Sequence, residues 1–115
     1  MLTDGEEVRQ FLYAEDCCEG LEAVMKNYDE LKSDDPLHIS SFRNNSILEV
    51  AETIQDVFKE HGMEHIQILP SKLKDTVQLN KRNEADPFIK KYWSPKTDLV
   101  TGISKVFESM KKDYD

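Results

Sequence analysis

Glycine is scarce in this chain, which has four glycines among 115 residues, each isolated from the others. Glycine-rich loops allow the backbone to approach phosphate groups, so the common nucleotide-binding motifs are excluded. The alternating Asp residues and following Gly of a calcium-binding EF-hand are absent as well. We therefore expect neither a bound cofactor nor a metal ion.

Cysteine is equally sparse, and its two copies, Cys17 and Cys18, are neighbours. Adjacent cysteines do not easily form a relaxed disulfide, so a disulfide framework is excluded. Both thiols fall in the first turn of an expected helix, where the helix dipole favours a reactive thiolate. The surrounding carboxylates oppose that effect, and packing is the preferred role for Cys18.

Long apolar runs are missing too, since no stretch of about 18 apolar residues occurs. Residues 1–3 do not open a secretory signal, and we expect a cytoplasmic protein without a membrane span. A chain of this length can bury one hydrophobic core. Residues 1–115 are therefore predicted to form a single acidic helical domain.

Capping and periodicity predict a mostly α fold, a compact bundle of four to five helices. Thr3-Asp4-Gly5-Glu6 has the form of a capping box, which predicts a first helix starting near residue 4. The apolar stripe changes direction near residues 14–16, where we expect a break. A second helix is predicted from Asp16 to about Lys32.

Two later helices have clearer signals. Ser46-Ile47-Leu48-Glu49 is a second capping box, followed by an apolar stripe, and Gly62 is placed to end that helix. Asp86-Pro87 opens a short helical turn, because proline is tolerated at the first helical position. A final amphipathic helix is predicted from Pro95 to about Asp113.

Two short segments, 65–69 and 76–80, have the alternation and β-branched content of strands. A small two-stranded β-hairpin is therefore compatible with the pattern, and an α+β fold is the alternative. Trp93 lies between two prolines beside other apolar residues, and we expect it to anchor the core rather than to stack on bases.

Charge is distributed unevenly along the chain. Residues 1–36 hold eleven acids and three bases, a net of −8, whereas residues 37–115 hold twelve of each. An acidic lobe favours a partner protein with a basic surface. The leading interpretation is a small, non-enzymatic protein-binding module of the inhibitor, adaptor or regulator type. Its predicted partner-binding residues are the acids of the second helix: Glu15, Asp16, Glu19, Glu22, Asp29 and Glu30.

Alternative functions have weaker support. Residues 71–96 carry seven bases and three acids, which suggests nucleic-acid binding, although the overall charge of −8 argues against it. The preferred uses of this basic segment are docking against an acidic protein or pairing with the chain's own acidic lobe. Assembly into an oligomer through an apolar helical face is another alternative. His61 and His65 are spaced four apart as in metal sites, but Gly62 between them should end the helix.

Overall fold

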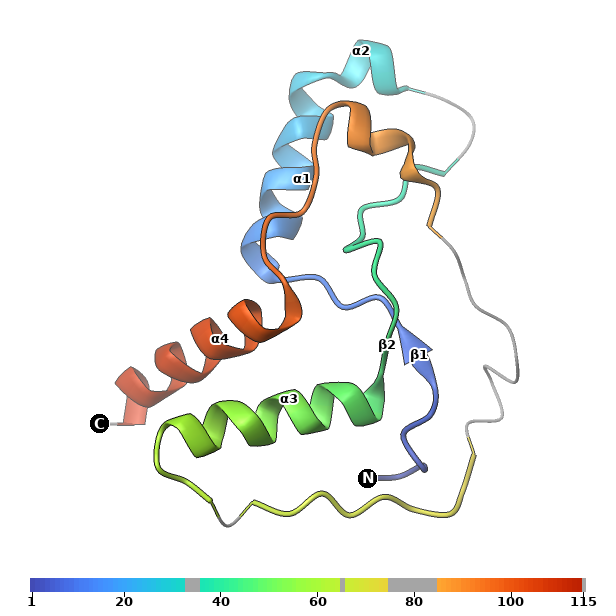
Figure 1. Ribbon diagram of the computed structural model, residues 1–115. Helices are drawn as coiled ribbons and strands as arrows, with labels where there is room; N and C mark the ends of the chain where they lie inside the picture. The colour runs from blue at the N-terminus through green and yellow to red at the C-terminus, as the bar shows by residue number, and fades with distance from the viewer. Residues whose placement is uncertain (33–35, 65, 75–84, 115) are drawn as a thin grey trace.

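The computed structural model describes residues 1–32, 36–64, 66–74 and 85–114, with the side chain of residue 114 outside that description. Within this part of the chain the fold is dominated by helices and has one small antiparallel sheet (Figure 1). The mostly α prediction is confirmed at that level. In order, the elements are β1 (Val8–Arg9), α1 (Ala14–Lys26), α2 (Tyr28–Leu31), β2 (Asn45–Ser46), α3 (Ile47–Glu60), the 3-10 helix η1 (Pro87–Lys91) and α4 (Leu99–Tyr114).

Helix α3 begins where its capping box predicts. The Ser46 side chain accepts a hydrogen bond from the Glu49 backbone N–H at 3.0 Å, and the Glu49 carboxylate accepts from the Ser46 N–H at 3.1 Å. The helix ends before Gly62, which has a φ of +81°. That left-handed conformation suits glycine and stops the helix, as the sequence predicts.

The predicted helix near residue 4 is wrong, because this segment is extended. Its carbonyl groups instead accept hydrogen bonds from the first turn of α3. Gly5 has a φ of +81°, which a right-handed helix cannot contain. The carbonyls of Gly5 and Glu7 accept hydrogen bonds from the Leu48 and Ile47 N–H groups, at 2.9 and 3.0 Å. These N–H groups lie in the first turn of α3 and have no partner inside the helix. The segment then continues into β1, which pairs with β2 so that Val8 faces Ser46.

Helix α1 starts two residues before the predicted position and stops earlier than predicted. Its last turn ends at Lys26, and Asn27 interrupts the helix, with its side-chain amide donating to the Ala23 carbonyl at 2.9 Å. The short α2 follows directly. Asp16 does not cap α1, because Tyr13 occupies the N-cap position.

The sheet is not the predicted hairpin. Residues 66–69 form no regular strand, while position 65 and positions 76–80 lie outside the described residues. The observed sheet pairs β1 with β2, two segments that both lie in the first half of the chain. Residues 66–74, called the strap below, run beneath α3 in Figure 1 and pair with the N-terminal segment.

A small set of apolar side chains forms the buried core of the described residues. They are Leu31, Val57, Ile89, Trp93 and Phe107. Trp93 is 8% exposed, so its predicted role as a buried anchor is confirmed. It follows η1, which begins at the expected Asp-Pro pair, with the Asp86 carboxylate accepting from the Phe88 N–H at 3.0 Å.

The molecule is thin, and a compact bundle is not confirmed. Its extents are 51 × 38 × 18 Å, and its radius of gyration is 16.9 Å. A compact domain of this length has a radius of gyration of about 13 Å. Helices α3 and α4 pack side by side, whereas α1 rises away from them (Figure 1). Among the described residues, no helix is long and apolar enough to cross a bilayer.

Candidate functional site

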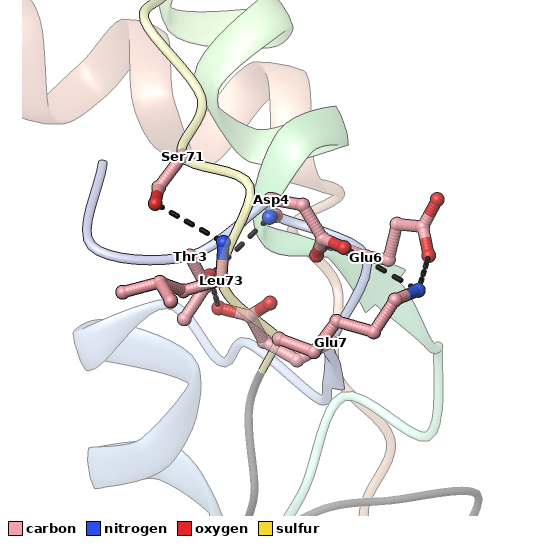
Figure 2. A network of polar contacts seen from close by, with 8 residues as sticks. Thr3, Asp4, Glu6, Glu7, Ser71 and Leu73 are labelled. Carbon is pink, nitrogen blue, oxygen red and sulfur yellow. Dashed lines mark hydrogen bonds and ion pairs between the residues drawn. The ribbon is translucent and has the colours of Figure 1, made fainter.

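One edge of the molecule is built by the N-terminal segment and the strap, which run parallel to each other (Figure 2). The amino group of Met1 donates to the Leu69 carbonyl at 3.0 Å. Ser71 N–H donates to the Thr3 carbonyl at 2.9 Å, and Asp4 N–H donates to the Leu73 carbonyl at 2.8 Å. These bonds fix the strap next to residues 1–4, which lead into β1. We call residues 1–9 together with the strap the β1 edge.

Two cations belong to the β1 edge. Lys74 on the strap places its Nζ 3.3 Å from a Glu6 carboxylate oxygen and 3.6 Å from one of Asp4 (Figure 2). Glu6, and then Asp4, raise the pKa of Lys74, because both carboxylates stabilise its charged form. Arg9, on β1, donates from Nη1 to the Val8 carbonyl at 2.9 Å and is half-buried. A planar guanidinium held in this way can bind carboxylate or phosphate with two hydrogen bonds.

A polar groove of about 760 Å³ lies on another side, between the loop at 41–45, α3 and residues 94–100. Its charged lining is mixed: Arg43, Lys90, Lys96, Glu49, Glu52, Asp56 and Asp98. Phe42 has a φ of +57°, a strained value for an aromatic residue, and its ring lies 4.8 Å from the Lys90 Nζ. The four carboxylates of this groove outnumber its three cations, so the groove lining carries no excess of positive charge.

Asp98, at the rim of the polar groove, caps the start of α4. Its carboxylate accepts a hydrogen bond from the Thr101 N–H at 2.8 Å. Hydrogen bonds from the Thr101 side chain and backbone lower the pKa of Asp98, with a smaller contribution from Arg43. Asp98 is therefore ionised at neutral pH and belongs to the helix end.

Of the predicted partner-binding acids, Asp16 is the one that the structure buries. It is 3% exposed, and its carboxylate accepts hydrogen bonds from the backbone N–H groups of Lys96 and Thr97, at 3.2 and 2.8 Å. Asp16 therefore ties α1 to the segment before α4 and cannot contact a partner. The sequence did not indicate this role, because the two donors lie 80 and 81 residues away.

The other predicted acids lie at the surface, and three of them are paired within the chain. Glu19 contacts the Lys96 Nζ at 2.9 Å and raises the pKa of that lysine. Two more pairs are local: Glu22 with Lys26 at 2.7 Å, and Asp29 with Lys32 at 3.8 Å. Glu15 and Glu30 are exposed.

The predicted pairing of the basic segment 71–96 with the acidic lobe is confirmed for two lysines. Lys74 bonds with Asp4 and Glu6, and Lys96 bonds with Glu19. Each contact joins the basic segment to the first third of the chain. The acidic lobe therefore has part of its counter-charge inside the same molecule.

The two cysteines and His61 lie on α1 and at the end of α3, respectively. Cys17 is half-buried and Cys18 is exposed, both on α1, so the packing role predicted for Cys18 is wrong. His61 closes α3, with its Nδ1 2.9 Å from the Val57 carbonyl and its ring against Phe107. His65 lies outside the described residues. In the described ranges, no three His, Cys, Asp or Glu side chains gather as metal ligands would.

The chain matches no family model. It is 30% identical over 105 residues to GDP-L-fucose synthase from Sinorhizobium fredii (strain NBRC 101917 / NGR234), a match that covers 91% of this chain and 31% of that enzyme. It thus spans about a third of the relative it matches.

Solved structures of three enzymes share the fold. Thermotoga maritima UDP-glucose 4-epimerase has a TM-score of 0.78 at 17% identity and covers 100% of this chain. The Bordetella bronchiseptica enzyme WbmF, in complex with NADH, has a TM-score of 0.74 at 18% identity and covers 99%. Bacillus cereus UDP-glucuronic acid 4-epimerase has a TM-score of 0.71 at 22% identity and also covers 99%. The shares of those chains that are matched are 35%, 32% and 35%, respectively.

These findings correct the functional interpretation of the sequence. The expectation of a non-enzymatic protein-binding module or regulator is wrong, because the sequence relative and the structural neighbours are enzymes: a GDP-L-fucose synthase, two epimerases named for UDP-sugars, and WbmF. The acidic lobe misled the prediction, since charge describes a surface and not a reaction. The fold of this chain is that of about one third of an epimerase such as the Thermotoga maritima enzyme.

Proposed function

We propose that this chain forms the part of a nicotinamide-dependent sugar-nucleotide enzyme that lies outside the dinucleotide-binding unit. The observation behind the proposal is that a sequence match and a structural match both point to sugar-nucleotide enzymes. A GDP-L-fucose synthase aligns with 91% of the chain, and a UDP-glucose 4-epimerase has the same fold over 100% of it. Both enzymes are named for reactions of sugars attached to nucleoside diphosphates.

The residues of this chain do not fit the nicotinamide cofactor itself. Dinucleotide-binding units use a glycine-rich turn between a parallel strand and a helix. The four glycines of this chain are isolated, and the sheet in its described residues is antiparallel. In the proposed enzyme, the cofactor is therefore held by a different part, and this chain contributes to binding of the nucleotide sugar.

We place the nucleotide sugar at the β1 edge. A diphosphate needs positive charge, and Arg9 supplies a guanidinium on a strand whose backbone is hydrogen-bonded. Lys74 adds a second cation on the neighbouring strap. Carboxylates stand at both candidate positions: Asp4 and Glu6 pair with Lys74, and Glu49, Glu52, Asp56 and Asp98 line the polar groove with its three cations. We prefer the β1 edge because Arg9 lies on a strand whose backbone is hydrogen-bonded, and the variants below test that choice.

The test is titration of the purified chain with UDP-glucose, GDP-L-fucose and NAD⁺, followed by amide chemical shifts in NMR spectra. We expect saturable shifts around Arg9 and Lys74 with a nucleoside diphosphate sugar, and weaker or no shifts with NAD⁺. The absence of saturable shifts with every nucleoside diphosphate sugar tested would overturn the proposal. NAD⁺ binding tighter than that of both sugars would contradict the division of roles.

A matched pair of variants locates the site. Arg9→Gln and Arg43→Gln each remove one positive charge, the first from the β1 edge and the second from the polar groove. Hydrogen bonds to charged groups contribute about 1.5 to 3 kcal/mol, so Arg9→Gln should weaken binding by about tenfold or more. Arg43→Gln should leave the affinity nearly unchanged, and the reverse pattern would move the site to the polar groove.

Two predictions from the sequence, on domain organisation and location, accompany this proposal. Residues 1–115 are taken as one structural unit, since single solved chains match them from end to end. The cytoplasmic location is likewise a prediction, which imaging of the tagged chain would check.

A further inference from the structure

An apolar groove lies between α3 and α4 and is closed on its third side by residues 11–14. Its volume is about 720 Å³, and its lining is apolar except for a few polar groups at the ends. Several large side chains in it remain open to solvent: Phe11, Ile54, Met63, Val106 and Met110, with exposed fractions between 36% and 54%. We call this region the α3–α4 groove.

Exposure on this scale is costly to a chain that is already thin. Burial of apolar surface contributes about 25 cal/mol per Å², and the described residues bury only five large hydrophobic side chains. One further layer over the groove would complete an ordinary core.

From these observations we infer that the α3–α4 groove binds an amphipathic α-helix from the remaining part of the proposed enzyme. This inference rests on the proposed function, because it takes its occupant from the part of the enzyme that this chain does not match. The matched proteins extend well beyond the match, since the chain covers 31% of the relative and 35% of the epimerase.

The shape of the groove favours a helix over an extended segment. Its two long walls are helices of 14 and 16 residues, which at 1.5 Å per residue run for about 21 and 24 Å. A third helix of similar length can pack its side-chain ridges between those of α3 and α4. An extended strand would leave its backbone N–H and C=O groups facing apolar walls without partners.

A second copy of this chain is a poorer occupant. Each copy carries a net charge of −8, so two copies repel each other. The charged residues at the groove, Asp98 and Lys111, cancel each other and do not change that balance. The favoured occupant is therefore an uncharged or weakly basic helical face with apolar residues spaced at three and four.

Two valines on α4 provide a matched pair of variants. Val106 lines the α3–α4 groove and is 48% exposed, whereas Val100 lines the polar groove and is 55% exposed. Val106→Asp and Val100→Asp place the same charge on the same helix at similar exposure. Circular dichroism and thermal melting of both variants establish that each one is folded before binding is compared.

The probe is a set of overlapping synthetic peptides that cover the Sinorhizobium fredii GDP-L-fucose synthase outside the 105 matched residues. Binding is followed by fluorescence anisotropy of labelled peptides against the 115-residue chain. We expect at least one peptide with an apolar helical face to bind. Val106→Asp should weaken its binding tenfold or more, and Val100→Asp less than twofold.

Three outcomes would overturn the inference. In the first, no peptide binds. In the second, both variants weaken binding equally. In the third, light scattering shows a dimer that Val106→Asp dissociates, which would assign the groove to a second copy. If the peptides fail while nucleotide sugars still bind, the groove assignment fails alone. If peptides bind but nucleotide sugars do not, the proposed substrate is wrong and the groove assignment stands. The occupant would then come from an enzyme that acts on another substrate.

Discussion

The carboxylate of Asp16 and the backbone N–H of Thr97 are 2.8 Å apart although 81 residues separate them in sequence. A second bond from the Lys96 N–H, at 3.2 Å, completes the contact. A single buried side chain in the first turn of α1 thus holds the segment that leads into α4.

Asp16→Ala should destabilise the fold by about 2 to 4 kcal/mol, because two backbone donors lose their acceptor and each unpaired buried group costs about 1 to 3 kcal/mol. Urea unfolding followed by circular dichroism measures the change. Glu15→Ala is the control, since Glu15 is the exposed neighbour and surface changes usually stay within about 0.5 kcal/mol. Equal midpoints for the two variants would show that the contact contributes nothing.

Gly20→Ala and Gly102→Ala should have opposite effects on stability. A Cβ at Gly20 would approach Ile39 Cγ2 to 3.0 Å and the Trp93 ring to 3.3 Å, whereas at Gly102 the nearest atom, Thr97 Cγ2, is 3.5 Å away. Overpacking typically costs about 1 to 3 kcal/mol, while alanine in place of glycine in a helix gains up to about 1 kcal/mol. Thermal melting should therefore show a lower midpoint for Gly20→Ala and an equal or higher one for Gly102→Ala.

Ser46→Ala should remove the capping box of α3 and cost about 0.5 to 2 kcal/mol of unfolding free energy. Ser109→Ala, at an exposed site within α4, serves as control and should change stability little. Amide hydrogen exchange adds a local measurement, because the first turn of α3 should lose protection in Ser46→Ala. If the two serine variants have the same melting temperature, the stability of α3 does not depend on its capping box.

Low pH should destabilise the first turn of α4. The pKa of Asp98 is lowered from 3.8 by its hydrogen bonds with Thr101, so the ionised form is bound more tightly in the folded state. This contribution is present above pH 3.8 and is lost as the pH falls through the lower folded-state pKa. The Thr101 amide resonance should shift over that range, and Asp98→Ala should abolish this titration. A Thr101 amide that titrates identically in the variant would rule out Asp98 as the cause.

Elements with local signals were predictable from the sequence. The capping box at Ser46 and the Asp86-Pro87 pair contain their own partners within three residues, so α3 and η1 appear where expected. The capping-box pattern at Thr3 predicted a helix that does not form, because Gly5 adopts φ +81° and residues 1–4 pair with the strap about 68 residues away. No local pattern encodes such a pairing.

The candidate site was harder still to predict. Lys74 and Arg9 are unremarkable in sequence, and only the parallel pairing of the strap with the N-terminal segment brings Lys74 to Asp4 and Glu6. The acids chosen from charge alone include Asp16, whose role is internal. Counting charges locates solvent-exposed surface but not a site. The similarity to GDP-L-fucose synthase is spread over 105 residues at 30% identity and is not concentrated in a motif.

The pairing of Met1 with Leu69 also affects how the chain folds. To form it, the chain must close a loop of 68 residues, and the entropy lost in closure grows with the logarithm of that length. Contacts of such long range form late and slow the folding rate, whereas the local turns of α3 can form early. The β1 edge, where we place the nucleotide sugar, is thus assembled from the last contacts to form. A bound ligand that bridges Arg9 and the strap would slow unfolding more than it speeds folding.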